Sequence, residues 1–424
     1  MWEQKLKATK QALKEWIKKP APNPTSLRKE IVQTLEELQI NMENRDVTSA
    51  LLDNEVKIQC STFQSFRLEE EYWRIKSRSL WLKAGDRNTT FFHRQYRARL
   101  CRNHISEITT AEGKICKGFS QIKEAAENHY RQLFTAGIQG NEEDTADFLS
   151  NIPLLVRPED NFDLNRPFTE EEVIKVIWSM DSDKAPGSDG FTIHFYKMCW
   201  DIIKIDLLKM IKGFRNKAKV GGGTNSTYLA LIPKESNPET FARFRPISLC
   251  NASYKILAKL LANRIKPLLN RLISSNQGGF VEGRHIPDNV VQVQEIIHSS
   301  QKRKEKGMLI KLDMANAFDR VNRPFLYKVL LAFGFSPHFV ALIKACTDNP
   351  WIAPLVNGRP SSFFHAQRGL RQGCPLSPFL YILMADTLSR KLSAEKDVGS
   401  LPGLKPSIHS PAQNHAVLQM TLSY

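Results

Sequence analysis

The stretch Gly307-Met-Leu-Ile-Lys-Leu-Asp-Met-Ala-Asn-Ala-Phe-Asp319 is the part of the sequence that decides the expected fold. Residues 308–312 form a short apolar run, interrupted by Lys311, that predicts a buried strand. This strand would carry Asp313 at its C-terminal end, where α/β folds place functional carboxylates. An Asp at such a position is more often a turn former or a cap. The stretch alone therefore leaves both roles open for Asp313.

A second stretch favours the functional role for Asp313. This stretch is Gln367-Arg-Gly-Leu-Arg-Gln-Gly-Cys-Pro-Leu-Ser-Pro378. Together with Asp313-x-x-x-Ala-Phe-Asp319 and Arg245-Pro-Ile-Ser-Leu249, it resembles the reverse transcriptase of LINE-type (non-LTR) retrotransposons, in particular the plant branch. Two more patterns match the family, Trp81-Leu-Lys-Ala-Gly-Asp-Arg-Asn-Thr-Thr-Phe-Phe-His93 and Asp183-Lys-Ala-Pro-Gly-Ser-Asp-Gly190. Five motifs in the family's order make a specific signal over nearly the whole chain.

The resemblance implies an α/β (α+β) fold with the fingers and a partial palm of a right-hand polymerase, preceded by a helical, basic N-terminal extension. The expected parts are a helical arm (1–75), a basic extension (76–135), an acidic linker (136–168), fingers (169–306), a partial palm (307–395) and a tail (396–424).

Local patterns predict several of the elements inside these parts. In the arm, prolines at 20, 22 and 24 separate two helical patterns, and the acidic residues of 136–168 are typical of a loop. Thr169 with Glu172 forms a capping-box signature at the start of a helix. Residues 228–233 predict a strand, and helices are expected from Tyr254 to about Ile273, from near Pro324 and after Pro375.

Composition limits the compartment and the partners. Sixty Lys and Arg against 44 Asp and Glu give a formal charge of +16, which suits a polyanion, although general solubility explains part of it. The seven cysteines include no C-x-x-C pair, as expected of free thiols in a reducing compartment. Neither a signal core nor a run of membrane-spanning length occurs. We expect an intracellular protein, nuclear or cytoplasmic and not secreted, without a membrane partner.

Two basic stretches are candidate nucleic-acid contacts. Residues 74–102 carry nine basic side chains and one acid, with aromatic residues between them, so phosphates and bases could both be bound. The alternative is a solvated helix face. A second stretch, 243–271, has seven basic residues and no acid. The resemblance implies template RNA as the ligand, and the candidate contacts are Arg78, Lys83, Arg87, Arg94, Arg97, Arg99, Lys255 and Arg264.

The resemblance also implies a site for the incoming dNTP. Arg245 matches the family position that contacts the triphosphate, a role suited to a guanidinium that can engage two oxygens. Phe318 matches the aromatic residue that excludes a 2′-hydroxyl, although ordinary core packing would explain it equally well. Gln372 and Gly373 match the loop beside the nascent base pair. Asp319 matches a position that is not a metal ligand, and we expect it to be structural.

Polymerisation in this family needs Mg²⁺ held by converging carboxylates. Two ions about 3.5–4 Å apart stabilise the attacking oxygen of the DNA primer and the leaving oxygen. Asp313 matches the first carboxylate, whereas the pair expected in a later [FY]-A-D-D box occurs nowhere in the sequence. If Val417 onward is encoded as GTT TTG CAG ATG ACA CTC TCA TAT, restoring one T yields Val-Phe-Ala-Asp-Asp-Thr-Leu-Ile. We therefore hypothesise that residues 418–424 are out of frame.

With one carboxylate of three, the chain is expected to lack polymerase activity, and the strand of 308–312 is expected to have an open edge. Three other interpretations remain, and the simplest is an untranslated or rapidly degraded relic. The second is a catalytically dead RNA-binding relic, which would show salt-dependent RNA binding without extension. The third is an intron-maturase-like RNA-binding protein, which would need a C-terminal maturation region not found in this sequence.

Overall fold

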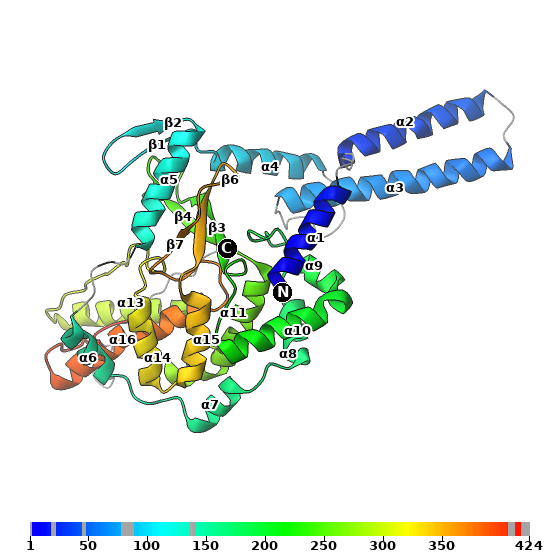
Figure 1. Cartoon of the computed structure of the whole chain (residues 1–424). Coiled ribbons are helices and arrows are strands. Elements are labelled where there is room, and N and C mark those ends of the chain that lie inside the picture. Colours follow the sequence, from blue (N-terminus) through cyan, green and yellow to red (C-terminus); the bar gives the residue numbers. More distant parts are fainter. Residues whose placement is uncertain are drawn as a thin grey trace. The chain divides into compact units, whose positions relative to one another are not determined.

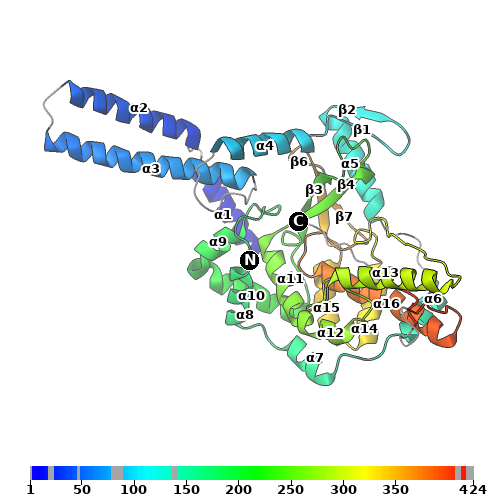
Figure 2. The same ribbon diagram turned by 180° about the vertical axis from the view of Figure 1, so that it is seen from behind.

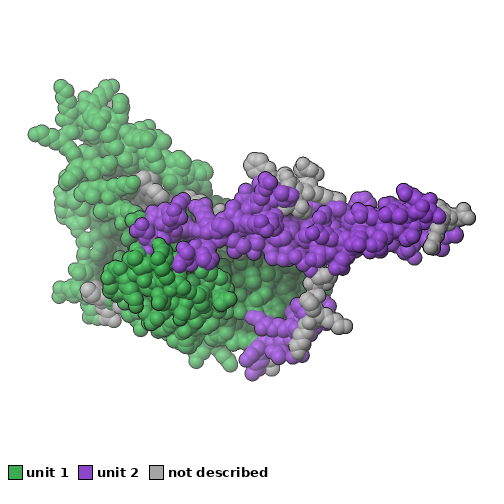
Figure 3. All heavy atoms as spheres, turned by 90° about the horizontal axis from the view of Figure 1, so that it is seen from above, with its two compact units in different colours: residues 1–3, 107–232, 240–424 green, residues 4–106, 233–239 purple. Residues whose placement is uncertain are grey.

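The structure, a computed structural model, describes residues 2–17, 23–44, 48–77, 89–135, 137, 141–405 and 412–416. The chain divides into two compact units (Figure 3). Unit 1 comprises residues 1–3, 107–232 and 240–424, and unit 2 comprises residues 4–106 and 233–239.

Unit 2 is helical. Helices α2 and α3 form a hairpin (Figure 1), and an ion pair between Arg28 Nε and Glu69 Oε2 at 2.9 Å joins them. Trp73 of α3 packs edge-on against His93 of α4, with ring centroids 4.5 Å apart. The expected arm of two helices is thus wrong in number, because three helices occupy it. The helices are α1 (Trp2–Trp16), α2 (Pro24–Glu43), α3 (Ser49–Ser77) and α4 (Thr89–Asn103).

Unit 1 is built around a sheet with the strand order β4-β3-β5-β6, and β7 also pairs with β5. Strand β3 runs parallel to β5, with Thr227 opposite Ile352, and helix α5 packs on β5. A separate antiparallel hairpin precedes α5. The strands are β1 (Glu107–Thr109), β2 (Ile115–Lys117), β3 (Ser226–Pro233), β4 (Phe244–Cys250), β5 (Trp351–Val356), β6 (Arg359–Pro360) and β7 (Phe364–His365).

Most of the core of unit 1 lies between helices. Helix α11 has ten buried residues, because it is apolar around most of its circumference, and it contacts α7, α8 and α15. Helices α14 and α16 lie side by side (Figures 1 and 2). The helices of this unit are α5 (Phe119–Phe134), α6 (Glu142–Ser150), α7 (Pro158–Asn165), α8 (Glu170–Trp178), α9 (Ile193–Met198), α10 (Trp200–Lys217), η1 (Phe241–Arg243), α11 (Ala252–Ile265), η2 (Lys266–Leu268), α12 (Leu269–Leu272), α13 (Ile286–Arg303), α14 (Arg323–Phe333), α15 (Pro337–Thr347) and α16 (Ser377–Val398).

Local signals placed several of these elements correctly. Thr169 caps α8 as predicted, since its Oγ1 accepts a hydrogen bond from the backbone N–H of Glu172 at 3.2 Å. Strand β3 and helices α11, α14 and α16 lie where the sequence predicts them. The mixed α/β fold is therefore confirmed.

The predicted buried strand at 308–312 is wrong. Residues 305–314 form no strand, and Met308 and Leu312 are 80% and 78% exposed. An apolar run becomes a strand only when another strand supplies its hydrogen bonds, and no pairing partner for this run occurs among the described residues. Because this run forms no strand, the open strand edge expected above is not seen either.

The expected loop over 136–168 is also wrong in detail. It contains α6 and α7, and each begins at a local cap. The Asn141 side chain accepts from the N–H of Glu143 at 3.3 Å, and the Asp160 carboxylate accepts from the N–H of Arg157 at 2.8 Å. The acidic residues that indicated a loop lie in the first turns of these helices, where negative charge is stabilising.

None of the helices in the described parts of the chain combines the length and the apolar character needed to cross a membrane.

Candidate nucleotide and nucleic-acid site

Two loops that are far apart in the sequence meet in unit 1. Residues 316–321 precede α14, residues 366–374 precede α16, and together we call them the loop junction. The N–H of Leu370 donates to the carbonyl of Phe318 at 2.7 Å, and the N–H of Gly369 donates to the carbonyl of Val321 at 2.9 Å. These backbone hydrogen bonds hold Phe318 beside the loop that contains Gln372, and both residues are predicted nucleotide contacts.

Gly369 and Arg323 make this close approach possible. Gly369 has φ +86°, and a Cβ there would lie 2.5 Å from the carbonyl oxygen of Asp319. Arg323 is 3% exposed, and its guanidinium donates to the carbonyls of Ala366, Arg368 and Gly369, each at 2.9 Å. Burial lowers the pKa of Arg323 to about 10, so it remains charged at neutral pH.

The side chains of Asp319 and Gln372 link the two loops a third time. Asp319 is 1% exposed, and the Nε2 group of Gln372 lies 2.8 Å from Oδ1 and 2.9 Å from Oδ2 of its carboxylate. The backbone carbonyl of Gln372 accepts from the N–H of Ser248 in β4 at 2.7 Å. Asp319 is therefore structural in its contacts, as expected, and Gln372 is buried.

Phe318 and Asp313 lie on the α16 side of the loop junction. The Phe318 ring stacks on Tyr381, with centroids 4.6 Å apart and an interplanar angle of 22°. The Tyr381 hydroxyl donates to the sulfur of Met314 at 3.5 Å, and burial raises the pKa of Tyr381. Phe318 is half-buried and Asp313 is exposed, so a ligand can reach both.

Strand β4 places Arg245 near the same loop. Arg245 is exposed, and in the described chain its guanidinium has no hydrogen-bond or ion-pair partner. Alternation along the strand puts Ile247 on the same face. A Cβ at Gly373 would lie 3.9 Å from the Ile247 side chain and 3.1 Å from the Ser248 carbonyl oxygen, at φ +105°. Gly373 thus lies beside the segment of β4 that carries Arg245.

The turn at 183–190 packs against the start of α11. The Asn251 side chain accepts from the N–H of Asp189 at 3.1 Å and donates to the carbonyl of Gly223 at 2.7 Å. Gly187 leaves no room for a Cβ beside Asn251. Lys255 is half-buried, and its Nζ lies 3.5 Å from the carbonyl oxygen of Ala185, so its ammonium group is partly occupied.

Arg264 does not face a ligand, and its predicted contact with nucleic acid is wrong. Its side chain is 6% exposed and pairs with the Glu172 carboxylate, with Nη2 to Oε2 at 2.9 Å and Nε to Oε1 at 3.0 Å. The guanidinium also lies 4.0 Å above the Phe168 ring. It donates in addition to three carbonyls, those of Leu164, Arg166 and Pro167. A buried arginine satisfied in this way is part of the packing between α11 and α8.

In unit 2, helix α4 presents four arginines to solvent. None of them forms an ion pair with a carboxylate in the described residues, and the four are Arg94, Arg97, Arg99 and Arg102. The other predicted contacts of this stretch, Arg78, Lys83 and Arg87, lie outside the described residues. The exposed group on α4 is therefore the basic surface that the structure supports.

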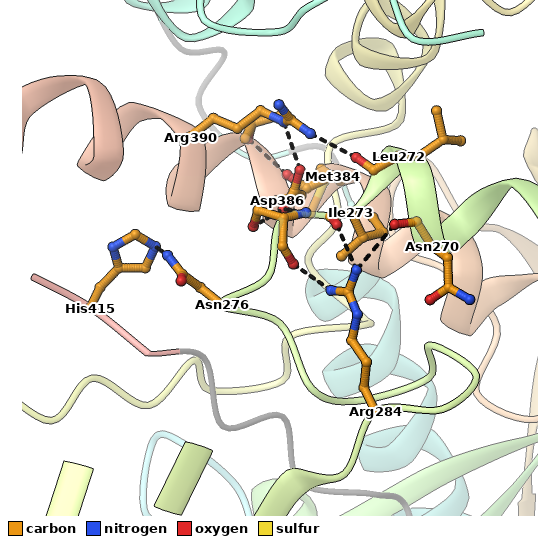
Figure 4. A network of polar contacts seen from close by, with 11 residues as sticks. Asn270, Leu272, Ile273, Asn276, Arg284, Met384, Asp386, Arg390 and His415 are labelled. Carbon is orange, nitrogen blue, oxygen red and sulfur yellow. Dashed lines mark hydrogen bonds and ion pairs between the residues drawn. The ribbon is translucent and has the colours of Figure 1, made fainter. Parts of the chain in front are cut away.

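A polar network holds the segment that leads into α13 (Figure 4). Arg284 donates to the carbonyls of Asn270, Ile273, Ser274 and Gln277. Two neighbouring groups complete the network: Asp386 accepts from Ser274 and pairs with Arg390, and Asn276 contacts His415 at 2.7 Å. The Arg284 guanidinium therefore donates its hydrogen bonds to carbonyl groups of the protein itself.

The described residues do not supply a two-ion Mg²⁺ site. No group of three or more His, Cys, Asp or Glu side chains suited to a metal occurs in them. Asp313 is the one predicted ligand, and the nearby Asp319 is buried against Gln372. These residues fit at most a single carboxylate contact with an ion.

Sequence reasoning missed two buried arginines that shape the site, Arg323 and Arg371. Arg371 is 8% exposed, its guanidinium lies 4.0 Å above the Tyr254 ring, and it donates to the side chains of Asn225 and Thr227. In the sequence, both arginines contribute to the net charge in the same way as exposed arginines do. The only sequence feature that sets them apart is the identity of their neighbours. Arg323 directly precedes Pro324 at the start of a helix, and Arg371 lies between Leu370 and Gln372 in the Gly-rich loop.

Comparison with known proteins supports the family. The reverse transcriptase (RNA-dependent DNA polymerase) family matches residues 232–405. The chain is 29% identical over 309 residues to the uncharacterized 149 kDa protein of transposon TX1 from Xenopus laevis, a match that covers 73% of this chain and 24% of that protein. It is 28% identical over 230 residues to the Pol polyprotein of the type-2 retrotransposable element R2DM from Drosophila melanogaster, covering 54% of this chain and 21% of that protein.

The RNA-directed DNA polymerase from mobile element jockey of Drosophila funebris is 27% identical over 292 residues, which is 66% of this chain and 31% of that protein. The matched region thus spans between 21% and 31% of these three relatives. The matching residues 232–405 include Arg245, Asp313 and the whole loop junction. Residues 232–405 of this chain thus match the reverse transcriptase (RNA-dependent DNA polymerase) family, and the relatives to which the chain is similar are proteins of transposable elements.

Proposed function

We propose that this chain is the template- and nucleotide-binding part of an RNA-directed DNA polymerase and that it does not extend a primer by itself. In this assignment residues 169–306 are the fingers and residues 307–395 a partial palm. The observation that carries the proposal is the loop junction, which holds Phe318 and Gln372 beside β4 and its exposed Arg245.

Template RNA would bind through the exposed arginines of α4. Their guanidinium groups are free to neutralise phosphates, because the described chain offers them no carboxylate partner. Arg245 has the same freedom and would contact the triphosphate of a dNTP. All seven cysteines are free, and four of them are buried, which supports a reducing, intracellular compartment.

The absence of polymerase activity follows from the carboxylates. Two-ion phosphoryl transfer requires several oxygen ligands to converge. Among the described residues, Asp313 is the one predicted metal ligand, and the carboxylate of Asp319 is buried against Gln372. Residues 417–424, where we hypothesise a shift of reading frame, lie outside the described residues.

A salt titration tests the RNA-binding part. Fluorescence anisotropy with a labelled single-stranded RNA gives log K against log salt for the wild type and for the variant with Arg94, Arg97, Arg99 and Arg102 changed to Gln. Because each phosphate contact contributes a slope of about −0.7, losing four contacts should flatten the slope by about 3.

The matched control removes the same charge from α10 and the residues after it, with Lys209, Lys212, Lys217 and Lys219 changed to Gln. These lysines are exposed, and the control should keep most of the wild-type slope. Equal slopes for the two variants would show that α4 binds RNA no differently from any other charged surface.

A further inference from the structure

The carboxylate of Asp319 is buried in the loop junction. It is 1% exposed, and a buried carboxylate is costly unless donors satisfy its oxygens. The Nε2 group of Gln372 lies 2.8 Å and 2.9 Å from the two oxygens, so one amide group spans both. Charge-assisted hydrogen bonds of this kind are about twice as strong as neutral ones.

We propose that Asp319 is a positioning residue that fixes the orientation of the Gln372 amide for an incoming dNTP. The inference rests on the nucleotide site proposed above and adds to it a residue that does not itself touch the nucleotide.

The chemistry of the two groups sets the orientation. An ionised carboxylate only accepts hydrogen bonds, whereas a side-chain amide has a donor end and an acceptor end. Since Asp319 accepts, Gln372 must turn its Nε2 end inward. Its Oε1 end then remains as an acceptor for a donor group, a hydroxyl or amine, on a bound nucleotide.

The backbone makes this orientation consequential. The carbonyl of Gln372 is fixed by the N–H of Ser248 at 2.7 Å, and the carbonyl of Phe318 is fixed by the N–H of Leu370 at 2.7 Å. Asp319 follows Phe318 directly, and Gly373 follows Gln372 directly. The backbone hydrogen bonds fix the positions of Phe318 and Gln372, but they do not fix the orientation of the Gln372 side-chain amide. The hydrogen bonds from Gln372 to Asp319 fix that orientation.

Exchanging the polarity of the pair separates positioning from stability. Asp319→Asn keeps the shape but can both donate and accept, so the Gln372 amide loses its fixed orientation. Gln372→Glu places two carboxylates together and should lower the unfolding temperature. In the double variant, which combines both changes, the new amide at position 319 can donate to the new carboxylate at position 372. The pair then re-forms with its donor and acceptor exchanged.

The test measures binding of a fluorescent dATP, in Mg²⁺ buffer, to the full chain and these variants, with the unfolding temperature measured alongside. We expect Asp319→Asn to weaken dATP binding about tenfold with a small shift in unfolding temperature. The double variant should recover the unfolding temperature lost by Gln372→Glu, and it should also recover part of the dATP binding, because the second oxygen of the new carboxylate is again an acceptor.

The control is Asp386→Asn, which changes an equally buried carboxylate that pairs with Arg390 away from the loop junction. It should lower stability and leave dATP affinity unchanged. Binding to Asp319→Asn that equals the wild type would overturn the positioning role alone. No binding of dATP to the wild type would overturn the nucleotide site, and with it the inference that rests on it.

Discussion

At the scale of single residues, two arginines in the same basic stretch differ in their burial. Arg245 and Arg264 both lie in the acid-free run from 243 to 271, yet Arg245 is exposed without a partner in the described chain and Arg264 is buried against Glu172. A sequence count treats them alike. What separates them is the location of Glu172 on a helix 92 residues away, which only the tertiary structure provides.

Arg264→Met should therefore destabilise the fold without affecting nucleic acid. The change leaves Glu172 and three carbonyls without their donor, and breaking a buried pair costs about 3 kcal/mol in the free energy of unfolding. Denaturant unfolding measures the loss. The control Lys266→Met removes an exposed ion pair with Glu282 and should change stability by less than about 1 kcal/mol. A drop in RNA affinity at unchanged stability would restore Arg264 to the nucleic-acid surface.

Gly369 is a residue whose replacement should damage the loop junction. An Ala there has φ +86° and a Cβ 2.5 Å from the Asp319 carbonyl, so backbone strain of about 1–2 kcal/mol adds to a clash of similar size. Gly358→Ala is the matched control, because Gly358 has φ +80° and nothing within 4 Å of its Cβ position. Thermal unfolding should show a clearly larger loss for Gly369→Ala, and equal losses would mean that the two loops do not approach this closely.

At the scale of elements, local signals predicted α8 and α11, missed α6 and α7, and failed for the strand expected at 308–312. Thr169 capped α8, and the apolar pattern located α11, because a helix makes its hydrogen bonds within itself. The run at 308–312 looked like a strand by the same kind of evidence. A strand depends on a partner elsewhere, and the described residues contain none for it.

Hydrogen exchange tests that contrast. Amides of 306–315 should exchange as fast as those of an unstructured peptide, whereas those of 227–231 in β3, paired with β5, should be protected. Mass spectrometry of the two peptides in the purified chain provides the comparison. Protection of 306–315 would show that this run has found a pairing partner.

At the scale of the whole molecule, the order of motifs in the sequence predicts the same family that residues 232–405 match. The candidate site followed in part: Phe318, Gln372 and Arg245 meet around the loop junction, while the buried Arg323 and Arg371 were invisible in a charge count. The sequence could not reveal them because a net charge of +16 does not distinguish solvated from buried arginines. The sequence motifs locate the candidate site, and the tertiary contacts determine which of its arginines remain exposed to a ligand.

We propose that this chain binds template and nucleotide without extending a primer. The most direct measurement incubates the purified chain with an RNA template annealed to a labelled DNA primer and all four dNTPs, in Mg²⁺ and separately in Mn²⁺. A gel-shift assay on the same samples reports binding. We expect a bound complex, weakened by salt, and a primer that stays at its original length. Primer extended in either ion would contradict the account, because Asp313 alone could not then be the whole carboxylate set.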